Sequence, residues 1–513
     1  MKSKLNKNIY RSLLILSFLG INAMIIYGIS SVWAYLNSGA DKSSILHIQG
    51  NIEETYLPEV HWEDLENPGR PIEAHTLKEI QNDYLRSWYV RNIALSNNDS
   101  YGVADYYTDS MRIKIDRVLD LNKQHNTSVK QTSLAHHPSL DFYSADGSLV
   151  VFTDRHVETY KEVWQNEQLI LRKKDTSSYK VLMLLEDGFW RIRHMVEIEE
   201  PDEEVQSSTK NSSSQLDIAK MKGLNYYPSK SAWDTFGSNF NKEVIANDFA
   251  QIRNMGLNSV RIFVPYEEFG KASASDENMA KLNIMLDLAY SEKLKVLVTL
   301  FDFYGNYDLM DWTLTHRHAE TIVKALKDHP ALLGWDLKNE PDLDFDSRGK
   351  EQVTAWLEEM SNRVKKWDPN HPVTIGWSSP ESSILLSNEV DFISFHYYQD
   401  PTNFLGKYKA LKDSVGDRPI LLGEYGYSSY SGIWNAFLGS EQKQADYYKE
   451  MQQYLNEGGI PYLFWTLYDF DEVPNSVVGR LPWRKQRQKY FGSIGIDGRQ
   501  KPCYQYLDLS LQK

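Results

Sequence analysis

Two glutamates, Glu340 and Glu424, follow short apolar runs in the second half of the chain. The first lies in GWDLKNEP (334–341) and the second in ILLGEYG (420–426). Two carboxyl groups that face one cleft can break a glycosidic bond, because one protonates the leaving oxygen while the other attacks the sugar or activates water. Either glutamate alone could instead cap a strand in solvent, so the hypothesis depends on the elements that would bring the two together.

Short apolar segments alternate with amphipathic segments from Ile218 to the end of the chain. We expect strands at residues 221–227, 257–264, 295–302, 332–339, 372–377, 390–396, 419–424 and 461–466. Eight strand–helix units predict an α/β fold, a (β/α)8 TIM barrel over residues 218–513. The alternative, a doubly wound open sheet, would need a glycine-rich phosphate turn after its first strand, and KGLNYYPSK (222–230) is not one.

The functional side chains of such a barrel lie where its strands end. The expected order puts Glu340 at the end of the fourth strand and Glu424 at the end of the seventh. Residues 218–510 resemble the clan of retaining (β/α)8 glycoside hydrolases, and within it the cellulase and mannanase group of glycoside hydrolase family 5. The resemblance rests on Asn-Glu-Pro (339–341), Gly-Glu-Tyr-Gly (423–426), Arg261 in SVRIFV, His396 with Tyr398, Trp465 in LFWTLYD, and the closing segment FGSIGIDGRQKPCY (491–504). It implies that Glu340 is the acid/base and Glu424 the nucleophile.

The chemistry of the neighbouring residues agrees with these two roles. Arg261 would hold the pKa of Glu424 down, and Tyr398 could donate a hydrogen bond to that carboxylate, as an ionised nucleophile requires. The acid must carry its proton when the substrate arrives, so we expect burial or the other carboxylate to raise the pKa of Glu340. The further supporting residues that we expect are Asn339 (sugar 2-hydroxyl), His396 (orientation of the acid or a bond to the sugar), Trp465 (a flat floor for the ring), Asp302 (sugar hydroxyls) and Trp377 (a subsite).

Each of these supporting residues also has a structural interpretation. Trp465 could pack in the core, Arg261 could form a structural ion pair, and His396 could be a core histidine. Asp302 could cap a loop, and we expect Asp336 to be a barrel ion-pair partner. The sequence has no metal-ligand spacing, and the expected mechanism needs no cofactor.

The N-terminal region predicts a membrane anchor. Residues 13–36 contain no charged residue, and residues 1–12 form a basic tail with Lys2, Lys4, Lys7 and Arg11. A stretch of this length spans a hydrocarbon core as one helix, and the positive-inside rule leaves the remainder of the chain on the extracytoplasmic side of the cell membrane. The alternative is a cleaved signal peptide, for which residues 38–40 (Ser-Gly-Ala) would be the cleavage site.

Between the anchor and the barrel we expect a stalk at 41–75, an α+β domain at 76–200 and a Ser-rich linker at 201–217. Residues 76 to about 121 show helical spacing, and strand-like runs from Ser139 to Glu199 follow, separated by Asp-Gly turns at 146–147 and 187–188. The last hairpin resembles that of the NTF2-like fold, which would imply a docking domain for an envelope partner. We expect His136 and His137 to lie in a surface loop.

The composition is that of an acidic globular protein. The 513 residues include 56 Lys and Arg against 70 Asp and Glu, a net charge of −14, which makes nucleic acid an improbable partner. Aromatic residues form 13% of the chain, which suits either a sugar-binding surface or a large core. Cys503 is the only cysteine, so no intramolecular disulfide framework is expected.

These observations favour a membrane-anchored, endo-acting, retaining β-glycosidase that works outside the cytoplasm on a β-linked glucan or mannan. Two alternatives stay open at this point. One is a transglycosylase in polysaccharide synthesis or export, and the other is a non-catalytic polysaccharide-binding subunit of an envelope complex.

Overall fold

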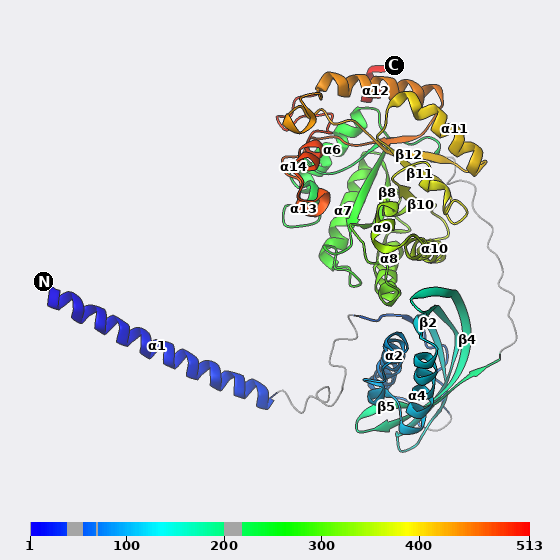
Figure 1. The fold of residues 1–513 in the computed structure, drawn as a ribbon. Coiled ribbons are helices and arrows are strands. Elements are labelled where there is room, and N and C mark those ends of the chain that lie inside the picture. The colour runs from blue at the N-terminus through cyan, green and yellow to red at the C-terminus, as the bar shows by residue number, and fades with distance from the viewer. Residues whose placement is uncertain (1, 38–54, 68–69, 200–217, 513) are drawn as a thin grey trace.

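The computed structural model describes residues 2–37, 55–67, 70–199 and 218–512, which form one long helix, an α+β domain and a barrel (Figure 1). The linker expected at 201–217 lies outside the described residues. Helix α1 (Lys2–Asn37) is continuous. Its segment Arg11–Gly28 is long and apolar enough to cross a membrane, with a mean hydropathy of 1.6, although an N-terminal signal sequence would have the same properties.

The α+β domain consists of three helices packed on a five-stranded sheet of order β1-β2-β3-β4-β5 (Figure 1). Its elements are α2 (Ala74–Asn97), α3 (Val103–Tyr106), α4 (Asp109–Gln124), β1 (Glu59–Val60), β2 (Thr127–Tyr143), β3 (Leu149–Gln165), β4 (Gln168–Glu186) and β5 (Phe189–Ile198). The predicted α+β class is confirmed, and the two expected Asp-Gly turns separate β2 from β3 and β4 from β5. Strand β2 begins at Thr127, well before the expected start at Ser139. The prediction missed its first residues because they are polar and lack a strong apolar alternation. The NTF2-like resemblance stays a prediction.

Two expectations about this domain are wrong. The end of the expected stalk lies on the domain, because Tyr56 is buried and β1 pairs in parallel with β2. His136 lies within β2 and is fully buried, so it is not in a surface loop. A polar chain holds it there: its Nε2 lies 2.7 Å from Oγ of Ser133, and its Nδ1 lies 2.6 Å from Oδ2 of Asp154.

The second half of the chain is a closed barrel of eight parallel strands, as predicted. The strands are β6 (Lys222–Asn225), β7 (Ser259–Pro265), β8 (Lys295–Asp302), β9 (Leu332–Asn339), β10 (Val373–Trp377), β11 (Ile393–Tyr397), β12 (Ile420–Tyr425) and β13 (Tyr462–Phe464). The long helices around them are α6 (Lys242–Asn254), α7 (Asp276–Ser291), α8 (Trp312–Leu326), α10 (Lys350–Trp367), α11 (Phe404–Val415) and α12 (Glu441–Glu457). Shorter helices are α9 (Phe345–Arg348), α13 (Asn475–Val478), α14 (Pro482–Lys489) and α15 (Tyr504–Leu507).

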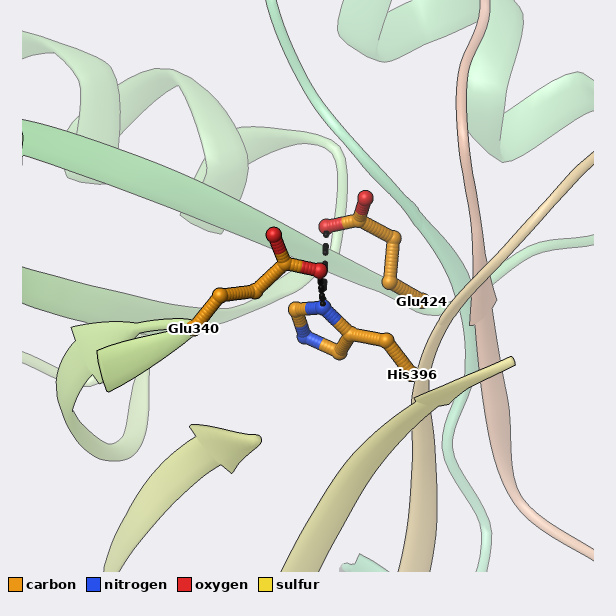
Figure 2. Close-up of side chains that lie close together, drawn as sticks. All are labelled: Glu340, His396 and Glu424. Carbon is orange, nitrogen blue, oxygen red and sulfur yellow. Dashed lines mark hydrogen bonds and ion pairs between the residues drawn. The ribbon is translucent and has the colours of Figure 1, made fainter. Parts of the chain in front are cut away.

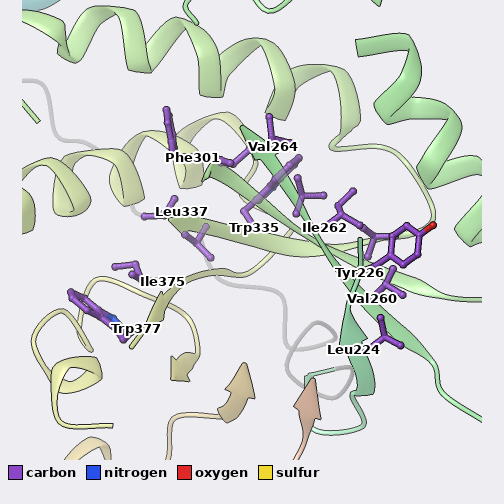
Figure 3. Packing of buried hydrophobic residues seen from close by; sticks show 14 of the residues in the cluster. Leu224, Tyr226, Val260, Ile262, Val264, Phe301, Trp335, Leu337, Ile375 and Trp377 are labelled. Atoms are coloured by element: carbon purple, nitrogen blue, oxygen red, sulfur yellow. The ribbon is translucent and has the colours of Figure 1, made fainter. Parts of the chain in front are cut away.

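The main hydrophobic core lies between the strands and the surrounding helices (Figure 3). On β8, Val296, Val298 and Leu300 belong to this outer core, whereas Leu297 belongs to a smaller cluster inside the barrel. Thr299 also faces inward and bonds another strand. This alternation follows from the two-residue period of a strand, and it determines which strand-end side chains can reach the cleft.

The α+β domain packs against the barrel helices α8 and α10 (Figure 1). The rings of Tyr160 and Trp312 meet across this interface with centroids 4.5 Å apart. Beside them, the Arg363 guanidinium of α10 bonds Glu158 of β3, and its Nε donates to Glu359 at 2.8 Å. Since Arg363 and Glu359 are both buried, the two domains share a desolvated ion-pair cluster.

Candidate active site

The carboxyl ends of the barrel strands open into a cleft of about 610 Å³, a size typical of ligand-binding sites. Its lining includes both predicted glutamates together with Asn339, Tyr398 and Trp465. The two glutamates come from strands on opposite sides of β10 and β11, and they converge at the centre of the cleft (Figure 2).

Glu340 follows β9 directly and has a left-handed backbone conformation, with φ 47° and ψ 52°. Such a conformation costs a non-glycine residue about 1–3 kcal/mol and is concentrated at functional sites. The Glu340 amide donates to the carbonyl oxygen of Gly376 at 2.7 Å, which holds the turn. Its side chain is 24% exposed, and its Oε1 lies 2.8 Å from Nδ1 of His396 (Figure 2).

Glu424 reaches the barrel interior because β12 contains one extra residue. Phe395 of β11 pairs with Leu422, and the next residue, His396, pairs with Glu424, so that Gly423 is left over as a bulge. A Cβ at Gly423 would lie 2.2 Å from Oγ of Ser394, so a side chain there would force Ser394 to shift. Bulges re-aim side chains next to active sites, and this bulge turns Glu424 toward the cleft.

An equivalent irregularity precedes Glu340. Thr374 of β10 pairs with Asp336, and Gly376 pairs with Asn339, so β9 also has one residue more than its neighbour. The extra residue places Asn339 beside Gly376, and Glu340, the next residue, lines the cleft. Each expected catalytic motif therefore combines a strand end with a bulge.

Several donors surround the Glu424 carboxylate. The Tyr398 hydroxyl donates a short hydrogen bond to Oε1, and Nη1 of Arg261 lies 3.4 Å from Oε2. Nδ1 of His396 is 3.8 Å from Oε2 (Figure 2). His396 thus lies between the two carboxylates, and one oxygen of each carboxylate lies within 4.8 Å of the other.

Arg261 connects the residues below the cleft. Its guanidinium is buried and donates to Asp336, to Oδ1 of Asn339 at 3.0 Å and to Oδ1 of Asn225 at 3.1 Å, in addition to Glu424. Asp336 also accepts bonds from the hydroxyl of Thr299 and from the amide of Gly376, each at 2.8 Å. The interpretation of Asp336 as a barrel ion-pair partner agrees with these contacts.

The electrostatics of Glu424 differ from our expectation. Burial raises the pKa of Glu424 above its usual range, and the negative charge of Glu340 acts in the same direction. His396, Arg261 and the Tyr398 hydroxyl oppose this increase without cancelling it. Arg261 does lower the pKa of Glu424, as expected, but its effect is smaller than that of burial, so the net shift is upward.

Of the remaining predicted residues, two line the cleft and one does not. Trp465 and Asp302 line the cleft, and Oδ2 of Asp302 accepts a 2.9 Å bond from the Tyr227 hydroxyl. Burial raises the pKa of Asp302. Trp377 does not line the cleft: it is 1% exposed and packs in the outer core with Val373 and Ile375, with which it shares one face of β10.

Sequence reasoning overlooked three features of the cleft. Tyr227 lines it and stacks on Phe263 with ring centroids 5.0 Å apart. Gly376 leaves the space that the site needs, because a Cβ there would lie 2.6 Å from Nη2 of Arg261. Arg484 and Arg487 of α14 form part of one wall. The signal that could have indicated this wall is the basic run RLPWRKQRQK (480–489) in an acidic chain.

Two groups of side chains resemble other kinds of functional site, a metal site and a hydrolytic triad. Glu340, His396 and Glu424 are close enough to hold a metal ion, but Arg261 and Tyr398 already satisfy Glu424, which suits proton and sugar chemistry better. The buried Ser133, His136 and Asp154 of the α+β domain are arranged like a hydrolytic triad. Their side chains have no exposed surface, so no substrate can reach the serine oxygen, and the group is a structural polar network.

Residues 219–471 match a protein-family model described as Cellulase (glycosyl hydrolase family 5). The chain is 28% identical over 207 residues to mannan endo-1,4-beta-mannosidase 1 of Oryza sativa subsp. japonica, which covers 32% of this chain and 46% of that protein. It is 25% identical over 284 residues to the beta-glucuronidase of Homo sapiens, which covers 50% of this chain and 40% of that one. The chain therefore spans less than half the length of these two relatives.

Solved structures include similar chains at lower identity. An exo-beta-1,4-mannosidase, Op5Man5 from Opitutaceae bacterium strain TAV5, superposes with a TM-score of 0.48 at 19% identity, covering 60% of this chain and 62% of that one. A GH5_18 protein from Bifidobacterium longum subsp. infantis superposes with a TM-score of 0.45 at 17% identity, covering 57% and 79%.

Proposed function

Since residues 219–471 belong to glycosyl hydrolase family 5, we propose that the protein is a retaining β-glycosidase that acts on a β-linked glucan or mannan. The observation that carries the proposal is the proximity of the Glu340 and Glu424 carboxylates, whose nearest oxygens lie within 4.8 Å. Retaining enzymes separate their carboxyl groups by about 5–5.5 Å, whereas inverting enzymes need about 6.5–9.5 Å to admit a water between carboxyl and sugar.

The environments of the two glutamates support different roles. Glu424 is held by a hydroxyl and a guanidinium, which stabilise a carboxylate, so it is suited to attack. Glu340 lies at the cleft with one histidine partner, so it can exchange a proton with a group bound there. Asn339 is held by Arg261 beside Glu340, in a position to bond the sugar 2-hydroxyl.

The reaction then has two displacements. In the first, Oε of Glu424 bonds the anomeric carbon while the glycosidic bond breaks, and the proton of Glu340 passes to the leaving oxygen. In the second, Glu340 takes a proton from a water molecule, the oxygen bonds the anomeric carbon, and Glu424 leaves as a carboxylate. Nδ1 of His396 lies 2.8 Å from Glu340 and 3.8 Å from Glu424, so it can stabilise whichever carboxylate is ionised at each step. If a sugar hydroxyl replaces the water, the same steps give transglycosylation.

The roles of the glutamates can be tested with azide, which attacks without a base. Glu340→Ala should slow cleavage of a substrate with a poor leaving group by about 10²–10⁴-fold, should accumulate the glycosyl-enzyme on an activated aryl β-glycoside, and should give a β-glycosyl azide. Glu424→Ala lacks the attacking group, so azide should enter directly and give the α-azide. Exchanged stereochemistry would reverse the two roles, and full activity of both variants would exclude this site.

We propose further that α1 anchors the enzyme and that residues 41–513 lie outside the cytoplasm. The support is the apolar segment Arg11–Gly28 together with the four cations that precede residue 13. An anchored enzyme is suited to trimming or remodelling a polymer during export. Protease treatment of intact spheroplasts should digest the barrel. A soluble mature form that begins near residue 41 would instead show that α1 is a cleaved signal.

A further inference from the structure

The wall of the cleft formed by residues 477–491 is strongly basic. Residues 473–496 contain Arg480, Arg484, Lys485, Arg487 and Lys489 and no acid, in a chain whose net charge is −14. Within this wall, the side chains of Arg484, Arg487 and Gln488 line the same cleft as Glu340 and Glu424. The two arginines are three residues apart on α14, so they share one face of the helix.

Neither guanidinium has a partner that explains its position. In the part of the chain that the structure describes, neither Arg484 nor Arg487 forms an ion pair, and both side chains are exposed. By contrast, Arg499 pairs with Glu441 at 2.7 Å.

Two like charges on adjacent turns of a helix repel each other. A neutral sugar carries no negative charge that would offset this repulsion. Arginine binds carboxylates through two parallel hydrogen bonds. We propose that the cleft accepts an acidic β-linked glycan, and that Arg484 and Arg487 bind the carboxylate of a uronic acid unit next to the bond that is cleaved. This inference rests on the proposed glycosidase function and specifies the substrate class for that site.

The test compares pairs of oligosaccharides that share a linkage and differ in charge. β-1,4-Linked oligomannuronate is paired with β-1,4-oligomannose, and β-1,4-linked oligoglucuronate with cello-oligosaccharide, using the full chain in neutral detergent. We expect the acidic member of at least one pair to have the higher kcat/KM. Arg484→Gln and Arg487→Gln should each lower kcat/KM on that acidic member by about tenfold or more, the usual worth of a charge-assisted hydrogen bond, and should leave the neutral member nearly unchanged.

Lys485→Gln is the matched control, because it removes one positive charge from the same helix. Lys485 does not line the cleft, and its Nζ lies 3.3 Å from Oδ1 of Asn475. It should retain the preference for acidic oligomers. If Lys485→Gln and Arg484→Gln lower kcat/KM equally, and only in nanodiscs of anionic phospholipid, the inference is overturned. The cations of α14 would then bind lipid headgroups.

A binding measurement separates this inference from the proposed function. Affinity electrophoresis of Glu340→Ala in gels that contain each polymer does not require turnover. We expect retention by an acidic polymer that the additional change Arg487→Gln weakens. Cleavage of neutral polymers with no retention by acidic ones would overturn the inference and leave the glycosidase function intact. Retention by acidic polymers with no cleavage of any polymer would support the inference and overturn the glycosidase function.

Discussion

The Tyr398 hydroxyl provides the sharpest test of how the cleft controls the ionisation of Glu424, the proposed nucleophile. It donates to Oε1 of Glu424, and that bond is one of the contacts that oppose the rise in the pKa of Glu424 caused by burial. Burial and the charge of Glu424 also raise the pKa of Tyr398 far above its usual value, so the phenol stays protonated and remains a donor. Tyr398→Phe removes the hydroxyl and keeps the ring.

The expected size of the effect follows from this one bond. A hydrogen bond to a charged group contributes about 1.5–3 kcal/mol, and one pKa unit corresponds to about 1.4 kcal/mol. Loss of the bond disfavours the ionised carboxylate, so the pKa of Glu424 should rise by about one to two units. Because only the ionised carboxylate attacks, the acidic limb of the pH profile should lie at higher pH in Tyr398→Phe than in the parent enzyme. Activity should be recovered at pH values above the raised pKa.

The assay is the pH dependence of kcat/KM on an activated aryl β-glycoside, whose departure does not need the acid Glu340. Its acidic limb then reports the ionisation of Glu424 in the free enzyme. Tyr397→Phe is the control, because the Tyr397 hydroxyl donates to the backbone oxygen of Asp400 and forms no hydrogen bond to either carboxylate. A loss of rate in Tyr398→Phe with an unmoved acidic limb, or a limb that moves to lower pH, would refute the reasoning.

Two further substitutions test the scaffold. Gly376→Ala would place a Cβ 2.6 Å from Nη2 of Arg261, and that side chain is fixed by several bonds. We expect kcat/KM to fall by about tenfold or more and the unfolding free energy to fall by about 1–3 kcal/mol, the usual cost of overpacking; unchanged kinetics would show that Arg261 can move freely. Arg363→Met would remove one of the two cations that pair with the buried Glu359 and leave Lys174, whose Nζ lies 2.9 Å from Oε2 of Glu359. Calorimetry should therefore show a loss of about 1.5–3 kcal/mol in unfolding free energy, the contribution of a hydrogen bond to a charged group, and an unchanged melting temperature would show that the domain interface does not depend on this cluster.

The strands and their order could be predicted because each is a short apolar run between turn signals. The observed bounds of β8 and β9 coincide with the expected segments 295–302 and 332–339. The two glutamates were predicted on the same basis, since the carboxyl ends of parallel strands meet at one face of a barrel. The α+β class likewise followed from helical spacing and Asp-Gly turns.

The direction of individual side chains was harder to predict. Trp377 was expected in the cleft because it ends a strand. It shares a face of β10 with Val373 and Ile375, however, and that face packs against the helices. His136 is a polar residue in a strand, and only its distant partner Asp154 makes its burial acceptable. The pKa of Glu424 depends on burial and on the charges of His396 and Glu340, which come from other strand ends and are not contained in the local sequence.

Alternation alone would have placed the proposed nucleophile, Glu424, on the wrong side of its strand. Ile420 and Leu422 face the helices and Leu421 faces the barrel interior, so an unbroken strand would turn Glu424 outward with Leu422. The bulge at Gly423 reverses the face, and Asn225 holds it by donating to the Gly423 carbonyl oxygen at 3.0 Å. A glycine directly before a strand-end glutamate is therefore part of the catalytic motif in a physical sense, because it permits the extra residue that turns the carboxylate inward.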